Sequence, residues 1–406
     1  MSTHEPRSQV PVVMKFGGSS VADLGRMREV ARRIAERAAV QPVVVVVSAM
    51  GKTTNELVAM ARELVDPPPQ RELDMLLTTG ERGSMALLAL AIQALGRPAI
   101  SLTGSQCGII TNHQHGRARI MEVRPFRILD EIAEGNVVIV GGFQGVSYKR
   151  EVTTLGRGGS DTTAVALAAA LGADCEIYSD VDGVYSADPR EVPAAARIDA
   201  LDYAEMQALA RAGAKVLHAQ AVQLAEERGI AIYARHTKPG VGGETVIRRN
   251  PVIRSGVHAV ASDTVVDLGL ELRPGAPRGR LAALAAELGA LGLLYLRIDG
   301  GRAGGLLSLT QRTDGPAVIE RFSEISAGLG VALAAARIDR GLALVSCIGA
   351  GLEERPELAP QAIAALSEVE VAPRQLHTDT RSLAFVVTSG ERVRAVQALH
   401  RRFVGA

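Results

Sequence analysis

Two glycine-rich segments carry residue types that suit anion binding. The first, residues 15–20 (Lys-Phe-Gly-Gly-Ser-Ser), lies between a predicted strand and a predicted helix. Its glycines allow backbone N–H groups to approach a phosphate, the helix N-terminus adds a partial positive charge, and Lys15 adds a full one. Because the lysine precedes the glycines, the segment is not a Walker loop. Taken alone, such a glycine pair more often makes only a tight turn.

The second segment, residues 155–163, is a glycine-rich loop that leads into an alanine-rich helix. Ser160 or Asp161 can cap that helix, and Arg157 can hold a carboxylate through two hydrogen bonds. A capped loop with no catalytic role explains the same residues. Two such junctions in one domain favour phosphoryl transfer, because one can bind the phosphates of the donor and the other the acceptor.

The other polar candidates are ambiguous on their own. Residues 178–190 contain Asp180, Asp182 and Asp188, which suit ribose hydroxyls or magnesium-bound water but are also common in turns. Glu81 and Lys215 are single charges, for which a solvated surface position is the commoner explanation.

Short apolar runs alternate with helical patterns between residues 11 and 247. Runs without polar alternation are typical of parallel strands that are covered on both faces. They predict strands at 11–14, 43–47, 99–102, 137–140, 176–178 and 230–233. Apolar residues spaced three to four apart predict a helix across 21–34, and residues 162–171 predict another. The first part of the chain is therefore an α/β sandwich.

Beyond about Ser255 the composition shifts to Ala, Leu, Gly and Arg, and two stretches repeat a similar order of elements. The first predicts a strand at 265–272, a helix at 281–288, strands at 293–298 and 306–310, and a helix at 316–325. The second predicts a strand at 342–348, a helix at 358–366, strands at 369–372 and 383–387, and a helix at 393–403. This order favours two ferredoxin-like modules in tandem.

Composition argues against some classes of function. The chain has 406 residues, with 45 Lys plus Arg against 44 Asp plus Glu and 47% hydrophobic residues. This balance gives no electrostatic reason to expect nucleic acid or an anionic membrane as a partner. Cys107, Cys175 and Cys347 are scattered, and no apolar run is long enough to cross a bilayer. We expect a cytoplasmic enzyme.

Eight segments, in this order, closely resemble the aspartokinases of the amino-acid kinase family. They cover residues 13–23, 44–57, 76–82, 101–111, 141–146, 152–171, 175–190 and 213–218, and are distributed along the whole stretch from 12 to 220. The matches RGGSDTTAVALAAAL (157–171) and EIYSDVDGVYSADPR (176–190) are the most specific.

The resemblance implies a fold and a domain organisation. The expected fold is a three-layer α/β sandwich with a mostly parallel open sheet, which forms a catalytic domain at 11–250. Two divergent ACT-like modules of the ferredoxin-like α+β type would follow at 251–335 and 336–406. In this family such modules bind feedback amino acids and mediate dimerisation, so a homodimer or higher homo-oligomer is expected.

The resemblance also implies an activity, the ATP-dependent phosphorylation of L-aspartate to 4-phospho-L-aspartate with ATP and Mg²⁺. The implied catalytic residues are Lys15, Asp161 and Lys215. The implied nucleotide contacts are Lys15, Gly17, Gly18, Ser19, Ser179, Asp180, Tyr185, Arg190, Lys215 and Val216. The implied aspartate contacts are Thr54, Glu81, Arg157, Gly158, Gly159 and Ser160. No residue is expected to act as a dedicated metal ligand.

These roles form a coherent mechanism. Glu81 would hold the α-ammonium of aspartate, Arg157 a carboxylate, and Asp161 would orient the lysines. The acceptor carboxylate is already ionised at pH 7, so no general base is needed. Catalysis would then consist of bringing two anions together while lysines, Mg²⁺ and helix N-termini offset their repulsion.

The C-terminal part departs from the family where effectors bind. Family members usually carry an Asp two residues before the Pro-Gly of the first effector loop, where this chain reads Leu272-Arg273-Pro274-Gly275. The chain also has Ile298-Asp299 where Gln-Asn is usual, and 378–380 reads Thr-Asp-Thr instead of Ser-Glu-Ile. An effector would lose polar partners, so weak or absent inhibition by lysine and threonine is expected.

Two other functions compete. One is a kinase of the same fold for another small acceptor, against which TTGE (78–81) and RGGSDTT (157–163) argue. The other is a catalytically silent regulatory or assembly protein, against which the retention of Lys15, Glu81, Asp161 and Lys215 argues.

Overall fold

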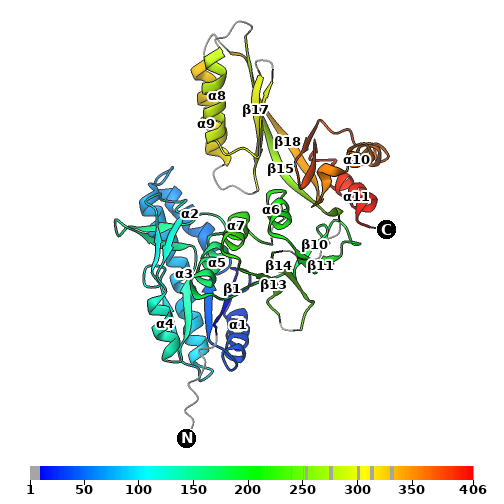
Figure 1. Cartoon of the computed structure of the whole chain (residues 1–406). Helices are drawn as coiled ribbons and strands as arrows, with labels where there is room; N and C mark the ends of the chain where they lie inside the picture. The colour runs from blue at the N-terminus through cyan, green and yellow to red at the C-terminus, as the bar shows by residue number, and fades with distance from the viewer. Residues whose placement is uncertain are drawn as a thin grey trace. The chain divides into compact units, whose positions relative to one another are not determined.

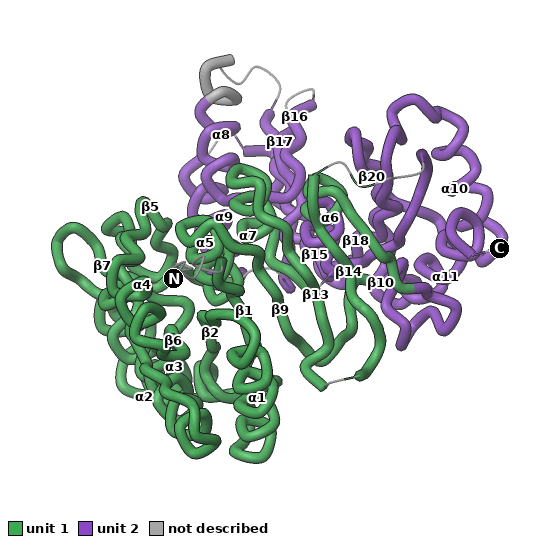
Figure 2. Tube along the Cα trace, turned by 60° about the horizontal axis from the view of Figure 1, so that its bottom comes forward, with its two compact units in different colours: residues 1–184, 197–207, 216–253 green, residues 185–196, 208–215, 254–406 purple. Residues whose placement is uncertain are grey.

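The computed structural model describes residues 10–214, 216–238, 240–249, 251, 255–273, 278–299, 302–310, 315–329 and 333–405 (Figure 1). The chain divides into two compact units, which Figure 2 colours separately. The N-terminal unit comprises 1–184, 197–207 and 216–253, and the C-terminal unit comprises 185–196, 208–215 and 254–406. The domain boundaries expected at 250 and 335 stay predictions.

An eight-stranded sheet forms the centre of the N-terminal unit, in the order β12-β14-β13-β9-β1-β2-β6-β3. Its strands are β1 (Val12–Phe16), β2 (Val43–Val47), β3 (Ala99–Leu102), β6 (Val137–Gly141), β9 (Cys175–Ser179), β12 (Ala200–Leu201), β13 (Ile232–His236) and β14 (Glu244–Ile247). Every neighbouring pair is parallel except β13 and β14. The expected open, mostly parallel sheet is confirmed.

Helices cover both faces of this sheet. Helices α1 (Leu24–Arg37) and α3 (Gln70–Gln93) share one apolar core with alternate strand residues such as Met14 and Phe16. Helix α5 (Gly159–Leu171) contacts β1 and β2 from the opposite side, and α7 (Ala219–Arg228) packs on α5. Because side chains alternate along a strand, Lys15 points to the α5 side while its neighbours enter the core. The unit is the expected three-layer sandwich.

Smaller elements complete the N-terminal unit. A four-stranded sheet consists of β5 (Ile120–Val123), β4 (Ile109–Thr111), β7 (Gln144–Ser147) and β8 (Val152–Thr154). The unit also contains α2 (Thr53–Leu64), α4 (Phe126–Ala133) and β11 (Arg197–Ile198). The short strand β10 (Val184–Tyr185) and helix α6 (Tyr203–Arg211) each contain residues of both units.

A buried carboxylate joins three elements of the sandwich. Glu176 on β9 is 4% exposed, and its oxygens lie 3.1 Å from Arg37 of α1 and 2.7 Å from Arg235 of β13. The hydroxyl of Tyr178 donates to it at 2.6 Å. A buried charge is tolerated when it is paired and hydrogen-bonded in this way. The network holds β9, whose carboxyl end adjoins that of β1, in a fixed register.

The C-terminal unit contains one six-stranded antiparallel sheet, in the order β16-β17-β15-β18-β20-β19. Its elements are β15 (Gly256–Leu272), α8 (Arg278–Ala290), β16 (Tyr295–Asp299), β17 (Arg302–Ser308), α9 (Gly315–Leu329), β18 (Leu333–Ala350), α10 (Leu358–Ser367), β19 (Gln375–Thr378), β20 (Ser382–Thr388) and α11 (Arg392–Phe403). Val266 and Leu268 share a core with α8 and α9, whereas Val260 and Val345 share one with α10 and α11. Two ferredoxin-like modules therefore share the long strands β15 and β18.

Several predicted elements of this unit differ from the structure. The strands predicted at 265–272 and 342–348 are parts of much longer strands. The strand predicted at 369–372 is wrong, because Glu370 adopts a left-handed conformation with φ 56° and the strand forms later, at Gln375–Thr378. Leu376 on this edge strand is 41% exposed, so the segment lacked the continuous apolar run that we used as a signal.

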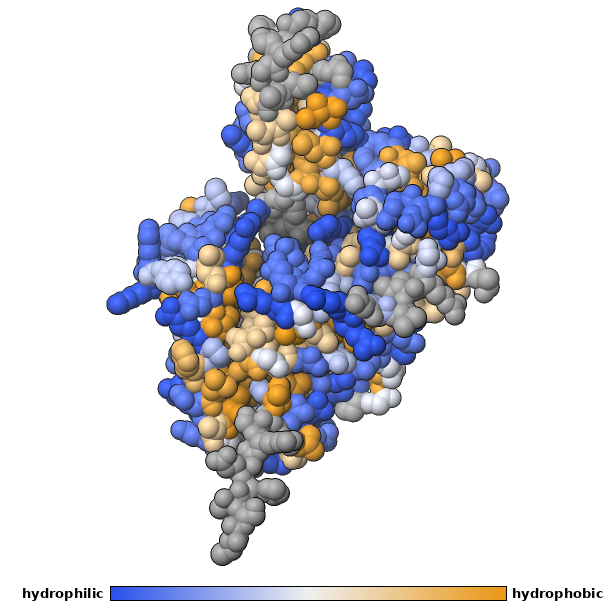
Figure 3. Space-filling model, viewed as in Figure 1, coloured by the Kyte–Doolittle hydropathy of each residue, from blue (hydrophilic) through white to orange (hydrophobic). Residues whose placement is uncertain are grey.

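One described helix, α3, is long and apolar enough by composition to cross a membrane. Half of its apolar window is buried inside the unit, as expected for the core helix of a globular protein. Apolar side chains also appear on the surface among charged ones (Figure 3). Exposed examples on α3 and α4 are Leu90 and Phe126, and single exposed apolar residues are common in soluble proteins.

Candidate active site

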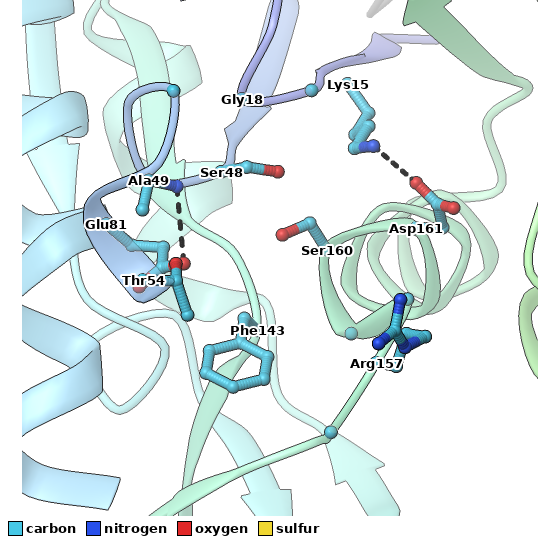
Figure 4. Close-up of a pocket in the computed structure, with 15 residues that line it drawn as sticks. Lys15, Gly18, Ser48, Ala49, Thr54, Glu81, Phe143, Arg157, Ser160 and Asp161 are labelled. Carbon is cyan, nitrogen blue, oxygen red and sulfur yellow. Dashed lines mark hydrogen bonds and ion pairs between the residues drawn. The ribbon is translucent and has the colours of Figure 1, made fainter. Parts of the chain in front are cut away.

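A pocket lies at the carboxyl ends of the central strands of the N-terminal unit (Figure 4). Its cavity volume is about 330 Å³. The lining residues are Lys15, Gly17, Gly18, Ser48, Ala49, Gly51, Thr54, Glu81, Phe143, Gly156, Arg157, Gly158, Gly159, Ser160 and Asp161. The two glycine-rich junctions predicted from the sequence thus face the same cavity. This is the edge at which open α/β sheets bind ligands.

Lys15 and Asp161 form an ion pair on one wall of the pocket. The Nζ of Lys15 lies 2.5 Å from an Asp161 carboxylate oxygen, and each side chain is 12% exposed. Lys15 is the penultimate residue of β1, and Asp161 lies in the first turn of α5. Asp161 therefore holds the ammonium group of Lys15 at the strand end, where the helix N-terminus adds further positive potential.

The predicted capping of α5 by Ser160 or Asp161 is wrong. Gly158 is the N-cap residue, with φ 73°, and no side chain makes a capping hydrogen bond. The left-handed conformation is one that glycine adopts without strain. Because Asp161 is already inside the helix, its carboxylate is available to Lys15 instead.

Gly18 and Gly80 permit the loop that follows β2 to approach both the loop that follows β1 and helix α3. A Cβ at Gly18 would lie 2.8 Å from the carbonyl oxygen of Ala49, and the N–H of Gly51 donates to the Gly18 carbonyl at 3.1 Å. A Cβ at Gly80 of α3 would lie 2.9 Å from the Cβ of Ala49. Larger residues at Gly18 or Gly80 would push this part of the pocket apart.

Glu81 places a nearly buried carboxylate in the opposite wall. It lies in the middle of α3, is 3% exposed, and accepts one hydrogen bond from the N–H of Ala49 at 3.3 Å. Its other oxygen is buried and has no partner among the described residues. Burial raises the pKa of Glu81 to about 7. A buried, half-satisfied carboxylate that faces a cavity is suited to receive a cationic group of a ligand.

Arg157 supplies an exposed guanidinium at the pocket, whereas Thr54 lines it from the first turn of α2. In Figure 4, Glu81 and Thr54 lie on one side of the cavity and Arg157, Ser160 and Asp161 on the other. The pocket therefore places the charged groups of Arg157, Lys15 and Asp161 opposite the carboxylate of Glu81.

Ten of the predicted site residues line this pocket: Lys15, Gly17, Gly18, Thr54, Glu81, Arg157, Gly158, Gly159, Ser160 and Asp161. Four others belong to the same unit but do not line it: Ser19, Ser179, Asp180 and Val216. Ser179 is the last residue of β9 and Asp180 follows it, and Tyr178 of the same strand pairs with Phe16 of β1. Tyr185 and Arg190 belong to the C-terminal unit, and Lys215 lies outside the described residues.

Sequence reasoning missed several residues of the pocket. Ser48, Ala49 and Gly51 follow β2, and the signal for them was their position after a buried valine run. Phe143 has a φ of 69°, which is unusual for an aromatic residue, and its N–H donates to Thr163 at 3.1 Å. No sequence pattern predicts the positive φ of Phe143.

His218 was also missed. Its ring lies directly against Gly158, because a Cβ there would come within 2.2 Å of the imidazole Cγ. Its Nδ1 is buried without a partner among the described residues, and burial lowers the pKa of His218. The His218 ring therefore packs against the glycine-rich loop at Gly158.

An open α/β sheet with a lysine-bearing glycine loop and a second glycine-rich helix start at one edge defines a small-molecule kinase. Residues 11–235 match the model of the amino acid kinase family. Aspartokinases of Mycolicibacterium smegmatis and Mycobacterium tuberculosis are each 42% identical over 405 residues, which covers 97% of this chain and 96% of theirs. The chain belongs to the amino acid kinase family and, within it, to the aspartokinases.

Solved structures agree with this assignment. Aspartokinase III of E. coli, crystallised in complex with aspartate and ADP, matches with a TM-score of 0.83 at 27% identity. The match covers 97% of this chain and 99% of that chain. It extends through the C-terminal part, so the likeness is not limited to the kinase fold.

Proposed function

We propose that this protein transfers the γ-phosphoryl group of ATP to the side-chain carboxylate of L-aspartate, which yields 4-phospho-L-aspartate. The observation that carries the proposal is that Lys15, Arg157 and the buried carboxylate of Glu81 line the same pocket. Glu81 receives the α-ammonium of aspartate, and Arg157 receives a carboxylate. Lys15 then faces the reacting groups.

The mechanism needs charge stabilisation rather than proton transfer. The acceptor carboxylate is ionised at pH 7 and attacks as it is. The ammonium of Lys15 and the N-terminus of α5 neutralise charge that spreads over the transferred phosphoryl group. Asp161, 2.5 Å from Lys15, fixes the direction of the ammonium.

The nucleotide contacts and Mg²⁺ are finer parts of the proposal. Ser19 follows the glycine pair, and Ser179 and Asp180 lie at the carboxyl end of the neighbouring strand β9, so these side chains suit phosphate and ribose contacts. Tyr185, Arg190, Lys215 and Val216 are assigned to the nucleotide by resemblance. Among the described residues, no group of three or more His, Cys, Asp or Glu side chains is arranged to hold a metal ion. We expect the phosphates of ATP, rather than protein side chains, to supply most of the ligands of Mg²⁺.

Trapping of the acyl phosphate tests the proposal. The protein is incubated with MgATP, hydroxylamine and either L-aspartate or one of the competing acceptors, such as L-glutamate or N-acetyl-L-glutamate. We expect a hydroxamate with aspartate only. Preference for another acceptor would favour the alternative kinase, and no turnover with any acceptor would favour a catalytically silent protein.

We place the reaction in the cytoplasm, as the first step from aspartate toward lysine, threonine and methionine. The ACT-like modules of the C-terminal unit are the parts through which we expect a homodimer or higher oligomer to form. Exposed apolar residues on the edge strand β16, Leu296 and Ile298, are each 45% exposed and are compatible with such an association.

Weak feedback control is a further prediction. Asp379 stands near the second effector position, but its carboxylate already accepts from the N–H groups of Arg381 and Ser382 and from the Ser382 hydroxyl. The Asp379 carboxylate therefore already makes its hydrogen bonds within the turn 379–382. Residues 274–277 of the first effector loop lie outside the described residues. We expect less than twofold inhibition at millimolar lysine or threonine, measured separately and together at aspartate concentrations near KM. Potent inhibition by either amino acid would contradict this prediction.

A further inference from the structure

Helix α3 carries a second buried carboxylate, that of Asp74, in addition to Glu81. The two residues are seven positions apart, which is two helical turns, so their side chains lie on the same face of α3. Asp74 is 1% exposed and is not among the residues that line the pocket. A carboxylate is tolerated in such a place when hydrogen bonds replace its lost hydration. The partners of Asp74 therefore show which segments it holds.

Asp74 accepts hydrogen bonds from two segments of the four-stranded sheet. The hydroxyl of Thr154, the last residue of β8, donates to its Oδ1 at 2.6 Å. The N–H of Gly116 lies 3.1 Å from both carboxylate oxygens, and Nδ1 of His115 lies 2.8 Å from Oδ2. Because an ionised carboxylate only accepts hydrogen bonds, this imidazole nitrogen carries a proton. Asp74 thus connects α3 to the end of β8 and to the loop between β4 and β5.

Both segments contact the loop that carries Arg157. Gly156 and Arg157 follow β8 directly and line the pocket. The carbonyl of Thr154 accepts from the N–H of Ala118 at 2.8 Å, and a Cβ at Gly156 would lie 3.2 Å from the carbonyl oxygen of Gly116. Glycines stand on both sides of Arg157 and offer no side chains for packing. The place of Arg157 therefore depends on the anchored backbone at the start of its loop.

We propose that Asp74 is a positioning residue for aspartate binding, because it connects the Arg157 loop to the helix that carries Glu81. The inference rests on the proposed function, in which Glu81 receives the α-ammonium of aspartate and Arg157 receives a carboxylate. These two side chains lie on opposite sides of the cavity (Figure 4). Helix α3 then sets their separation, directly at Glu81 and through Asp74 at Arg157. Without the hydrogen bonds of Asp74, aspartate would have to order the loop as it binds, which weakens binding.

The test compares valine substitutions at two adjacent residues of β8. Thr154→Val keeps the size of the side chain and removes its hydrogen bond to Asp74. Thr153→Val is the matched control, because Thr153 is also buried and its hydroxyl bonds instead to that of Thr111, likewise at 2.6 Å. We expect Thr154→Val to raise the KM for aspartate roughly tenfold, the usual effect of losing one hydrogen bond to a charged group. The KM for ATP and kcat should stay within about twofold, and Thr153→Val should resemble the unaltered protein.

A conservative variant separates positioning from general damage to the sheet. Thr154→Ser retains the hydroxyl that donates to Asp74, so we expect its KM for aspartate to stay within about twofold of the unaltered value. His115→Ala serves if Thr154→Val does not fold, because the His115 side chain is 16% exposed and its loss removes a different partner of Asp74. We expect His115→Ala to raise the KM for aspartate severalfold.

Three results would overturn the inference. The first is an unchanged KM for aspartate in folded Thr154→Val, or in folded His115→Ala where that variant replaces it. The second is an equal rise in Thr153→Val, and the third is an equal rise in the KM for ATP. All three are measured against an unaltered protein that phosphorylates aspartate, so the proposed function stands when the inference fails. If the unaltered protein itself has no aspartate kinase activity, the proposed function is contradicted and the inference fails with it.

Discussion

Lys15→Met is expected to lower kcat by about 10³-fold or more, which is the usual effect of removing one group that stabilises transition-state charge. The Lys15 ammonium lies 2.5 Å from Asp161 at the strand end and faces the cavity between the glycine loops. Charge spreads over the phosphoryl oxygens only as the bond to ADP breaks, so the loss should fall on kcat more than on KM. Steady-state kinetics with MgATP and aspartate provide the measurement.

Lys149→Met is the matched control, because Lys149 is exposed in a turn of the same unit and does not line the pocket. We expect it to retain full activity. Lys15→Met leaves the largely buried carboxylate of Asp161 without its ionic partner, so a fall in stability is expected as well. Thermal unfolding must therefore show that the variant is folded at the assay temperature. Wild-type kcat in a folded Lys15→Met variant would contradict the role of Lys15.

Glu81→Gln is expected to raise the KM for aspartate by about 10²-fold, because a buried charge-assisted hydrogen bond to the α-ammonium is lost. The KM for ATP should change little.

In the unaltered protein, the KM for aspartate should depend on pH. Since the pKa of Glu81 is about 7 in the empty pocket, the carboxylate is progressively protonated below that pH. The KM for aspartate should therefore rise as the pH falls from 8 to 6, and this rise should disappear in Glu81→Gln.

Glu81→Gln is expected to stabilise the substrate-free protein against unfolding. A carboxyl whose folded pKa is raised makes folding less favourable once it is ionised. The penalty appears as the pH rises above the unfolded value near 4.5 and is complete above about 7. Its size is on the order of 3 kcal/mol. Glu81→Gln should thus raise the Tm at pH 8 and leave it nearly unchanged at pH 4. A lower Tm at pH 8, together with an unchanged KM for aspartate, would contradict the assignment of Glu81 as the ammonium receptor.

The sequence predicted the sheet well because each central strand is buried on both faces. The five valines of β2 are all 1% exposed or less, and such runs have few alternative structures. Edge strands are harder, because partial exposure interrupts the run. The short strand β19 shows this: its pattern gave no signal, and the segment predicted as a strand contains Glu370 in a left-handed conformation after α10 has ended at Ser367.

The pocket was predictable only in part. Glycine spacing identified the two anion-binding junctions, but the meeting of Glu81 with Ala49, or of His218 with Gly158, depends on contacts between residues far apart in the chain. Burial is what turns Glu81 from an ordinary surface charge into a group with a pKa near 7. The residues alone indicated phosphoryl transfer, whereas the resemblance to aspartokinases indicated aspartate as the acceptor.

The packing of residues 185–196 bears on how such enzymes can be recombined. Ala187 and Val192 complete a core whose other members come from the last 150 residues or so, among them Val260, Leu366 and Leu399. If residues 254–406 were exchanged for those of a relative, the core would consist of residues from two parents, because Ala187 and Val192 would remain from the first. Productive chimaeras should take residues 185–196 from the same parent as α10 and α11. Natural variation at Glu191 is expected to follow variation at Arg392, whose guanidinium donates two hydrogen bonds to the Glu191 carboxylate, so the two positions should be inherited together.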